Sequence, residues 1–242
     1  MRIAVAINTA WNIANFRRGL IESLIQEGHE VVAISPSDEF VDEIEALGAQ
    51  FCAVAMQSHG INPLKDFVLI LNYFSLFRKE KIDCLLAYTV KPNIYGTLAA
   101  SVLGIPVINN ISGLGTTFIR ESWLTWIVKK LYRFALGRSH HVFFQNHDDL
   151  HLFLKYKLVD KQNISTIPGS GINLVRFSVP PVRDDNNEDK IKTTKFLLIA
   201  RLLSDKGINE FAQAAEKLGQ ELSGVSFQLL GGFDKNNPAR IN

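Results

Sequence analysis

The sequence predicts an α/β protein with a doubly wound, mostly parallel sheet. Short aliphatic and β-branched runs, typical of buried strands, alternate along the chain with longer amphipathic stretches of helical periodicity. Gly28, Gly48 and Gly104 follow helical stretches at positions where C-caps are expected. Because right-handed crossovers leave few other topologies, this alternation favours a parallel sheet with helices on both faces.

The elements follow one another in a regular order. Strands are predicted at 3–7, 31–34, 51–55, 84–87, 106–111, 141–144 and 164–167, and helices at 16–27, 38–47, 64–79, 94–103, 122–136 and 147–155. A Pro-rich, charged tract from Pro180 to Thr194 interrupts this pattern and reads as a linker or surface loop. The pattern then restarts with a strand at 196–200, a helix at about 207–218 and a strand at 225–230.

These elements predict two unequal parts. We expect one complete domain at 1–178, a linker at 179–194, and only the start of a second, similar domain at 195–242, because three elements cannot close a sheet of this kind.

Composition narrows the function classes. The 242 residues carry a formal net charge of +2, which gives no global attraction to nucleic acid. Cys52 and Cys84 lie in apolar runs and are expected to be reduced core residues. The N-terminus runs straight into a strand without signal-peptide zones, and the apolar runs are too short to cross a bilayer. We therefore expect a cytoplasmic protein.

In open α/β sheets ligands bind at the carboxyl ends of the strands. The loop after the first strand, NTAWNIANFRRG, lacks the GxGxxG of dinucleotide-binding domains, so NAD binding is not expected. Its polar side chains beside an aromatic suit a sugar, and the candidates are Asn8, Trp11, Asn12 and Asn15. A polar loop with a helix-capping Asn explains the same residues equally well.

Two further loops offer candidates in the first domain. Lys91, in TVKPNIYG, stands beside a helix that opens at Pro92, where an ammonium and free backbone amides can meet a phosphate. The segment NNISGLGTTF at 109–118 contains Gly113 and Gly115, which permit close backbone approach to a ligand. An ordinary helix start and an ordinary strand-to-helix turn remain the alternatives.

The most specific loop is ARLLSDKGINEF at 200–211. A buried strand ends in Arg201, and Lys206 with Gly207 opens a helix after a short turn. Arg can hold two phosphate oxygens and Lys adds a mobile charge, so this loop suits a diphosphate. The alternative is a solvated Arg and a Lys that compensates Asp205.

The segment RLLSDKG, preceded by IPGSGINLVRF at 167–177, resembles the retaining family-4 glycosyltransferases of the GT-B fold. The N-terminal NTAWNIANFRRGLIESLIQEGHEVVAISP, the KPNIYGTLAASVLGIPVINNISGLGTTF block and SHGINPLKD at 58–66 resemble a bacterial branch that makes surface polysaccharides such as O-antigen and capsule. In that family an N-terminal Rossmann-like domain binds the acceptor, a C-terminal one binds a nucleotide sugar, and transfer takes place between them.

The resemblance implies roles for particular residues. Arg201 and Lys206 would hold the donor diphosphate and stabilise it as it leaves, with Gly171 and Gly207 close by. It implies a nucleotide-sugar substrate, with UDP as the expected nucleotide, and neither a cofactor nor a metal.

The chain also departs from the family pattern. Where many relatives carry a histidine this chain has SGLG, so His59, Asn109 and Ser112 are only candidates for sugar contacts, and no catalytic histidine is assigned. The family's paired glutamates, which lie downstream, are absent from these 242 residues.

The stretch 120–138, RESWLTWIVKKLYRFALGR, combines basic residues with Trp123, Trp126 and Tyr132 on a helical frame. Such a helix can lie on an anionic membrane surface. The alternative is an ordinary amphipathic helix that packs Trp123, Ile127 and Leu131 inward.

The functional expectation is transfer of a sugar from a nucleotide-diphosphate donor to a lipid-linked or polysaccharide acceptor, in the cytoplasm or on the inner face of the plasma membrane. The alternative is a truncated, non-catalytic fragment that binds acceptor or partner. A sugar-nucleotide epimerase or dehydrogenase is a third option, and the missing GxGxxG counts against it.

Overall fold

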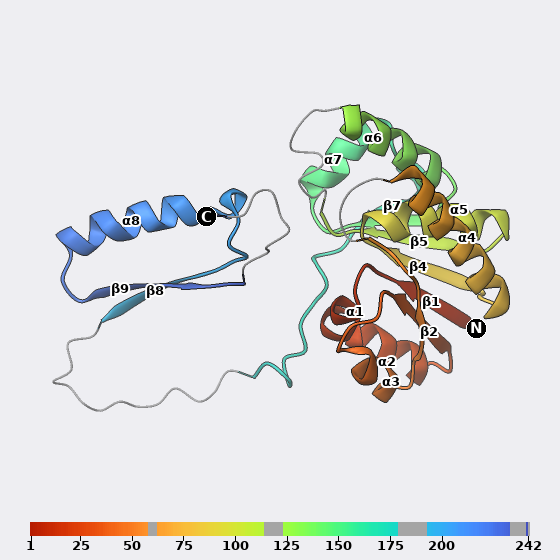
Figure 1. Cartoon of the computed structure of the whole chain (residues 1–242), viewed down its shortest axis with the longest axis horizontal. Coiled ribbons are helices and arrows are strands. Elements are labelled where there is room, and N and C mark those ends of the chain that lie inside the picture. Colours follow the sequence, from red (N-terminus) through yellow and green to blue (C-terminus); the bar gives the residue numbers. More distant parts are fainter. Residues whose placement is uncertain (58–61, 114–122, 179–192, 233–240, 242) are drawn as a thin grey trace. The chain divides into compact units, whose positions relative to one another are not determined.

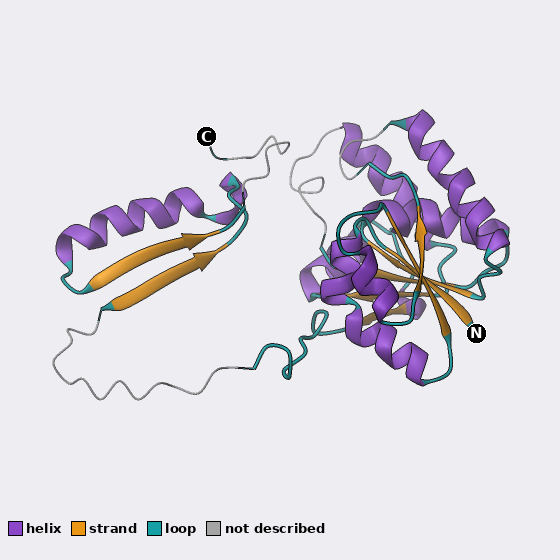
Figure 2. Ribbon diagram, turned by 60° about the horizontal axis from the view of Figure 1, so that its bottom comes forward, coloured by secondary structure: helices purple, strands orange, loops and turns teal. Residues whose placement is uncertain are grey.

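The computed structural model describes residues 1–57, 62–113, 123–178, 193–232 and 241. By its internal contacts the chain divides into two compact units, Met1–Ser178 and Val179–Asn242, called unit 1 and unit 2 below. Figures 1 and 2 show the helices and strands of each unit. The predicted linker, 179–194, falls almost wholly outside the described residues, and β8 begins at its last residue, Thr194.

Unit 1 is built on a parallel sheet that contains seven strands within the described residues. The strands are β1 Arg2–Ala6, β2 Glu30–Ser35, β3 Gln50–Ala53, β4 Cys84–Tyr88, β5 Val107–Ile111, β6 His141–Phe144 and β7 Ile164–Thr166. Every neighbouring pair is parallel. The predicted fold class, an α/β protein with a parallel sheet, is confirmed.

The order of the strands is β3-β2-β1-β4-β5-β6-β7. The chain moves outward from β1 through β2 and β3, returns to the other side of β1, and then moves outward again from β4 to β7. The direction therefore reverses between β1 and β4. In doubly wound sheets ligands bind at this switch point, outside the carboxyl ends of the strands.

Helices cover both faces of the sheet of unit 1 (Figure 1). One face carries α1 Ala10–Phe16, α2 Arg18–Gln26 and α3 Val41–Ala46. The other face carries α4 Pro63–Lys79, the π-helical turn η1 Pro92–Gly96, α5 Thr97–Val102, α6 Trp123–Leu136 and α7 His147–Lys155. A short 3-10 turn, η3 Lys161–Asn163, leads into β7.

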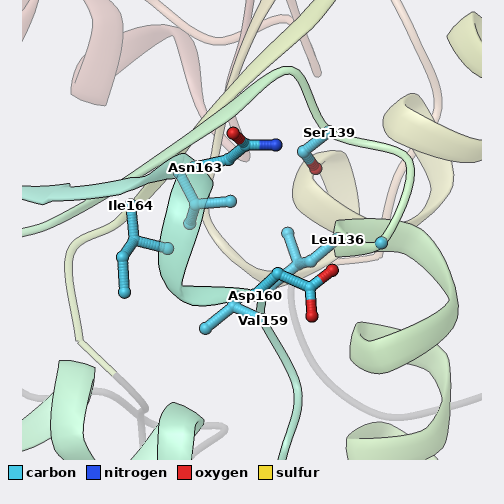
Figure 3. A pocket seen from close by; sticks show the side chains of 8 residues that line it. Leu136, Ser139, Val159, Asp160, Asn163 and Ile164 are labelled. Carbon is cyan, nitrogen blue, oxygen red and sulfur yellow. The ribbon is translucent and has the colours of Figure 1, made fainter.

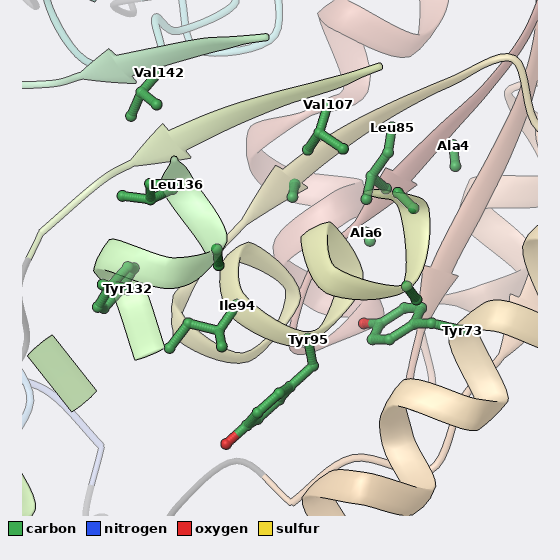
Figure 4. Close-up of a cluster of buried hydrophobic side chains, with 14 of the residues drawn as sticks. Ala4, Ala6, Tyr73, Leu85, Ile94, Tyr95, Val107, Tyr132, Leu136 and Val142 are labelled. Atoms are coloured by element: carbon green, nitrogen blue, oxygen red, sulfur yellow. The ribbon is translucent and has the colours of Figure 1, made fainter. Parts of the chain in front are cut away.

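Two hydrophobic clusters form the core because successive strand side chains point to opposite faces. From β1 and the residue after it, Val5 and Ile7 pack with the helices α1 to α3. Ala4 and Ala6 face the opposite cluster, where the small side chains leave room for Tyr73 and Leu85 (Figure 4). A sheet buried on both faces explains why its strands read as continuous apolar runs.

Three local features refine the predicted elements. Gly28, Gly48 and Gly104 have positive φ, as expected at helix C-caps. The first helix begins at Ala10 rather than near residue 16, and its cap is Thr9, whose Oγ1 accepts from the backbone N of Asn12 at 3.1 Å. Residues 92–96 form a π-helical turn before α5, a wider winding that often occurs at functional sites.

Unit 2 contains, within the described residues, the parallel strands β8 Thr194–Ile199 and β9 Val225–Leu230. Between them lie the 3-10 turn η4 Ser204–Lys206 and helix α8 Ile208–Glu221. Phe211 of α8 meets Phe227 of β9 with ring centroids 5.9 Å apart, so α8 covers one face of the pair. Leu197, Ile199 and Leu230 remain exposed.

Candidate functional site

The carboxyl edge of β1 carries the first group of predicted residues. Trp11 is 47% exposed, and its backbone N donates to Asp38 Oδ2 at 3.0 Å. Asn8 is half-buried, and its Oδ1 is buried without a hydrogen-bond donor among the described residues. Asn8 and Trp11 thus present one unsatisfied acceptor and one exposed ring at this edge.

The other two asparagines of this segment lie on helix α1 rather than in a loop. The Nδ2 of Asn15 donates to Trp11 O at 2.9 Å, so this amide is used within its own helix. Asn12 is half-buried, and its backbone N donates to Oγ1 of the N-cap residue, Thr9. The expectation that an asparagine caps the helix is wrong, because the shorter Thr9 side chain occupies the N-cap position.

The carboxyl edge of β4 is held in a strained conformation. Thr89, directly after the strand, has φ 62°, which is unusual for a β-branched residue, and its Oγ1 donates to Tyr88 O at 2.6 Å. Strained backbone of this kind costs on the order of 1–3 kcal/mol and tends to occur at functional sites.

Lys91 is held by a buried ion pair with Asp66 from the first turn of α4. Its Nζ lies 2.7 Å from Asp66 Oδ1, and the two side chains are 13% and 6% exposed. Asp66 Oδ2 also accepts from the hydroxyl of Tyr95 at 3.0 Å and from the backbone N of Asn62 at 3.2 Å. Burial, and then the neighbouring Asp66 carboxylate, raise the pKa of Tyr95 above its usual range. The ammonium expected to meet a phosphate therefore already has a carboxylate partner.

Of the predicted sugar contacts at the carboxyl edge of β5, one is buried and two are exposed. Asn109 is fully buried, and its Nδ2 donates to Asn93 Oδ1 and to Thr97 Oγ1, both at 2.9 Å. Its amide joins β5 to the π-helical turn, which argues against the expected direct sugar contact. Ser112 and Gly113 are exposed, and Gly113 has φ 147°. His59 and Gly115 lie outside the described residues.

Gln145 links the ends of β5 and β7. It follows β6 directly, and its Nε2 donates to Asn110 Oδ1 at 3.2 Å and to Ser170 Oγ at 3.1 Å. Ser170 stands between Gly169 and Gly171, both with positive φ. Gly171, which is exposed and is predicted to contact the nucleotide-sugar donor, therefore lies beside a residue that Gln145 links to the carboxyl end of β5.

In unit 2 the predicted phosphate loop follows β8. Gly207 has φ 73° and caps α8, and Lys206 is the last residue of η4, directly before it. Arg201 and Lys206 are both exposed. The two cations therefore lie in the turn between the carboxyl end of a strand and the start of a helix, as the sequence predicts; their binding roles stay predictions.

Helix α6 places its side chains differently from the expectation. Tyr132 is only 3% exposed and packs in the core with Val128 and Leu136, so it is not an interfacial aromatic. Trp126 and Phe134 are exposed, and Lys130 lies 5.4 Å from the centre of the Trp126 ring. Residues 120–122 and the side chain of Trp123 lie outside the described part of the chain.

Two cavities among the described residues lie at the opposite edge of the sheet. A cavity of about 20 Å³ is lined by residues such as Ser139, Asp160, Asn163 and Ile164 (Figure 3). A shallower depression of about 500 Å³ adjoins it and is lined in part by Arg133 and Lys157. Because Ile164 is the first residue of β7, the first cavity lies at the amino end of that strand, and the second shares Gly137, Val159 and Asp160 with it. The first is large enough for about one water molecule.

Sequence reasoning missed Asp66 and Gln145. Gln145 could have been found, because it directly follows a predicted strand and the carboxyl-edge rule applies to every strand. Asp66 gives no such signal. It lies on a helix 25 positions before Lys91 in the sequence, and only packing brings the two side chains together.

A doubly wound parallel sheet with polar side chains at its switch point is an arrangement in which α/β proteins bind ligands. The chain matches the model of the family described as glycosyl transferase 4-like over residues 2–146, and it belongs to that family. The predicted resemblance is confirmed.

The relatives of known activity include bacterial glycosyltransferases. The chain is 28% identical to the N,N'-diacetylbacillosaminyl-diphospho-undecaprenol alpha-1,3-N-acetylgalactosaminyltransferase of Campylobacter jejuni, covering 98% of this chain and 65% of that protein. It is 27% identical to the UDP-Gal:alpha-D-GlcNAc-diphosphoundecaprenol alpha-1,3-galactosyltransferase of Escherichia coli, covering 75% and 49%. It is 22% identical to the capsular polysaccharide biosynthesis glycosyltransferase CapM of Staphylococcus aureus, covering 91% and 58%. The chain thus spans about half to two thirds of the length of these relatives.

Solved structures share the fold. Anabaena HepE in complex with UDP and glucose matches with a TM-score of 0.68 and 13% identity, over 96% of this chain and 61% of that one. UDP-GlcNAc 2-epimerase from Neisseria meningitidis matches with a TM-score of 0.63 and 14% identity, over 95% and 65%. Because an epimerase shares the fold, the fold by itself does not exclude epimerisation, and the distinction rests on the family match. Among the described residues no helix is long and apolar enough to cross a membrane.

Proposed function

We propose that the protein transfers a sugar from a nucleotide-diphosphate donor to a lipid-linked acceptor in the synthesis of bacterial surface polysaccharide. The observation that carries the proposal is the pair Arg201 and Lys206 in the turn between β8 and α8, in a chain of the glycosyl transferase 4-like family. The three relatives are glycosyltransferases, and the names of two of them specify an undecaprenol diphosphate. UDP is the proposed nucleotide, as in the name of the Escherichia coli relative.

The proposed reaction breaks the bond between the anomeric carbon of the sugar and the donor diphosphate. The acceptor hydroxyl forms the new bond to that carbon and releases its proton, while the nucleoside diphosphate leaves with the bonding electron pair. Negative charge therefore grows on the diphosphate. Arg201 and Lys206, together with the N-terminus of the 14-residue helix α8, are suited to stabilise that charge. At Gly171 and Gly207 positive φ brings the backbone to the surface without a side chain.

The acceptor side of the proposal rests on unit 1. Trp11 offers an exposed ring and Asn8 a buried, unsatisfied oxygen, a pairing that suits a sugar face and one of its hydroxyls. Ser112 and Gly113 add an exposed, small-residue turn at the end of β5. We assign these residues, and not the buried Asn109, as the acceptor contacts to test first.

A transfer assay tests the activity. Labelled UDP-sugars are offered with a short-chain prenyl-diphosphate sugar. Arg201→Ala and Lys206→Ala are compared with Lys217→Ala, which removes an exposed lysine on helix α8, after the turn. We expect the first two variants to lose about 10²- to 10³-fold in rate, the usual effect of removing one donor that stabilises a developing anion. Full activity in both would contradict the assignment.

A second candidate function is that this chain binds an acceptor or a partner protein without catalysing transfer. The observation that favours it is the face of β8 and β9 opposite α8, where Leu197, Ile199 and Leu230 are exposed, although parallel sheets are normally covered on both faces. The same assay separates the two candidates when it is run on this chain and, if the reading frame continues past Asn242, on the longer product. Activity only in the latter would assign binding to the chain and catalysis to the longer protein.

We further propose that the face of α4 and α6 contacts an anionic membrane, where a lipid-linked acceptor would reside. On α6, Trp126 and Phe134 are exposed beside Lys130 and Arg133. The first half of α4 adds an exposed apolar stripe of Leu64, Phe67, Val68 and Leu71. Both helices lie on the same face of the sheet (Figure 1). Apolar side chains beside cations suit an interface with anionic head groups.

Sedimentation with vesicles tests the membrane contact. We expect the chain to sediment with vesicles containing phosphatidylglycerol but not with neutral vesicles, because the attraction depends on the negative surface potential. Lys130→Glu combined with Arg133→Glu is expected to abolish sedimentation, whereas Lys217→Glu in unit 2 serves as the control. Equal recovery in the supernatant with both kinds of vesicle would refute the contact.

A further inference from the structure

Arg17 is a buried arginine at the junction of α1 and α2. It is only 7% exposed, and its guanidinium carbon lies 4.1 Å above the centre of the Tyr88 ring. One terminal nitrogen, Nη1, donates to the carbonyl of Phe16 at 3.2 Å. The Nε is buried and has no acceptor among the described residues. Among the described residues, the Arg17 guanidinium thus has one nitrogen on a backbone carbonyl and one buried nitrogen without an acceptor.

No carboxylate of the described residues forms an ion pair with Arg17. The next residue, Arg18, does form ion pairs. Arg18 lies 3.1 Å from Glu43 and 3.9 Å from Glu22, although it is more exposed than Arg17. Buried charges in proteins are almost always paired, because removing an ion from water costs several kcal/mol, of order 20 in the idealised case. Burial also lowers the pKa of Arg17, and the electrostatic interaction with the Tyr88 hydroxyl group offsets this only in part.

The position of Arg17 in the fold is that of a ligand contact. Tyr88, beneath the guanidinium, is the last residue of β4, and β4 pairs with β1 across the switch point of the sheet. Asn8, with its unsatisfied oxygen, lies just beyond the end of β1. The second cation at this edge, Lys91, is already neutralised by Asp66. Arg17 thus brings a positive charge, with no carboxylate partner among the described residues, to the edge where ligands of such sheets bind.

We propose that the Arg17 guanidinium binds the diphosphate of the lipid-linked acceptor. This inference rests on the proposed function. A diphosphate supplies the missing counter-charge, and its oxygens match the fork of a guanidinium, which can donate two parallel hydrogen bonds. The donor diphosphate has its own candidate cations, Arg201 and Lys206, in unit 2. The two diphosphates of one reaction are therefore assigned to different cations.

A binding measurement tests the site without requiring catalysis. The parent protein for this test is the full chain with Arg201→Ala and Lys206→Ala, which removes the proposed donor cations. Arg17→Met and Arg18→Met are each added to this parent and compared. Titration calorimetry is run with inorganic pyrophosphate, geranyl diphosphate and UDP. We expect Arg17→Met to weaken binding of pyrophosphate and geranyl diphosphate at least about tenfold, the effect of losing a charged hydrogen bond, and Arg18→Met to change it less than about twofold.

The controls keep the test decisive. Near-ultraviolet circular dichroism shows whether Arg17→Met folds, and Arg17→Lys keeps the charge without the fork, so it is expected to bind with intermediate affinity. In the chain with intact donor cations, UDP binding is expected to be insensitive to Arg17→Met.

Three outcomes would overturn the proposal. The first is that pyrophosphate does not bind the Arg201→Ala, Lys206→Ala chain. The second is that Arg17→Met binds pyrophosphate with the same affinity as that chain. The third is that Arg17→Met loses as much affinity for UDP as for geranyl diphosphate. Because binding is read without turnover, an inactive enzyme with Arg17-dependent binding would refute the proposed function and not this site.

Discussion

Unit 1 and unit 2 each place a lysine at the carboxyl edge of a parallel sheet, but in opposite surroundings. In unit 1 Lys91 is buried, and a carboxylate from α4 neutralises it. In unit 2 Lys206 is exposed in a turn before a helix. The same residue type therefore holds the fold together in one unit and remains available to a ligand in the other. The amount of packing around each loop makes the difference.

The largest effect is expected from breaking the buried pair. Asp66→Asn leaves the Lys91 ammonium buried beside a neutral amide and should destabilise unit 1 by about 3–5 kcal/mol. Lys206→Ala in unit 2 should change stability by less than about 0.5 kcal/mol, because the side chain is exposed. Urea unfolding followed by tryptophan fluorescence measures the stability of unit 1, since Trp11, Trp123 and Trp126 all belong to it, and far-ultraviolet circular dichroism follows both units. Equal midpoints for Asp66→Asn and the parent would contradict the structural role of the pair.

A smaller effect is expected from the buried tyrosines of unit 1. Tyr73 is fully buried, and its hydroxyl has no hydrogen-bond partner in the described part of the chain (Figure 4). Tyr73→Phe should therefore be neutral or stabilising by up to about 1 kcal/mol at pH 7. Tyr95→Phe is the matched control, because its hydroxyl donates to Asp66, and it should destabilise by about 1 kcal/mol.

The same variants predict a pH dependence. Burial raises the pKa of Tyr73 above its ordinary value of about 10, so the folded state disfavours the phenolate. The stability that this group contributes is complete below about pH 10 and is lost as the pH rises toward the folded-state pKa. Above pH 10 the free energy of unfolding should fall less steeply with pH in Tyr73→Phe than in the parent protein. The two slopes should differ by up to about 1.4 kcal/mol per pH unit. An unchanged slope would contradict the burial of this hydroxyl.

Much of the fold could be predicted because its signals are local. Apolar runs, helical periodicity and the glycine caps at Gly28, Gly48 and Gly104 depend on residues close together in the sequence, and the strands appear within a few residues of their predicted bounds. The sequence predicts a loop where helix α1 lies, because the polar residues of this segment resemble loop composition. The Thr9 cap and the apolar contacts of Ile13 decide its conformation.

The sequence by itself determined the family, the parallel sheet and the position of Arg201 and Lys206 in a turn between a strand and a helix. Tertiary structure alone decided which polar residues are available to a ligand. It buried Asn109 in a network with Asn93, gave Lys91 a partner on a distant helix, and left Arg17 buried with no carboxylate partner in the part of the chain that the structure describes. The physical reason is that burial and pairing depend on contacts between elements far apart in the chain, which no local pattern encodes.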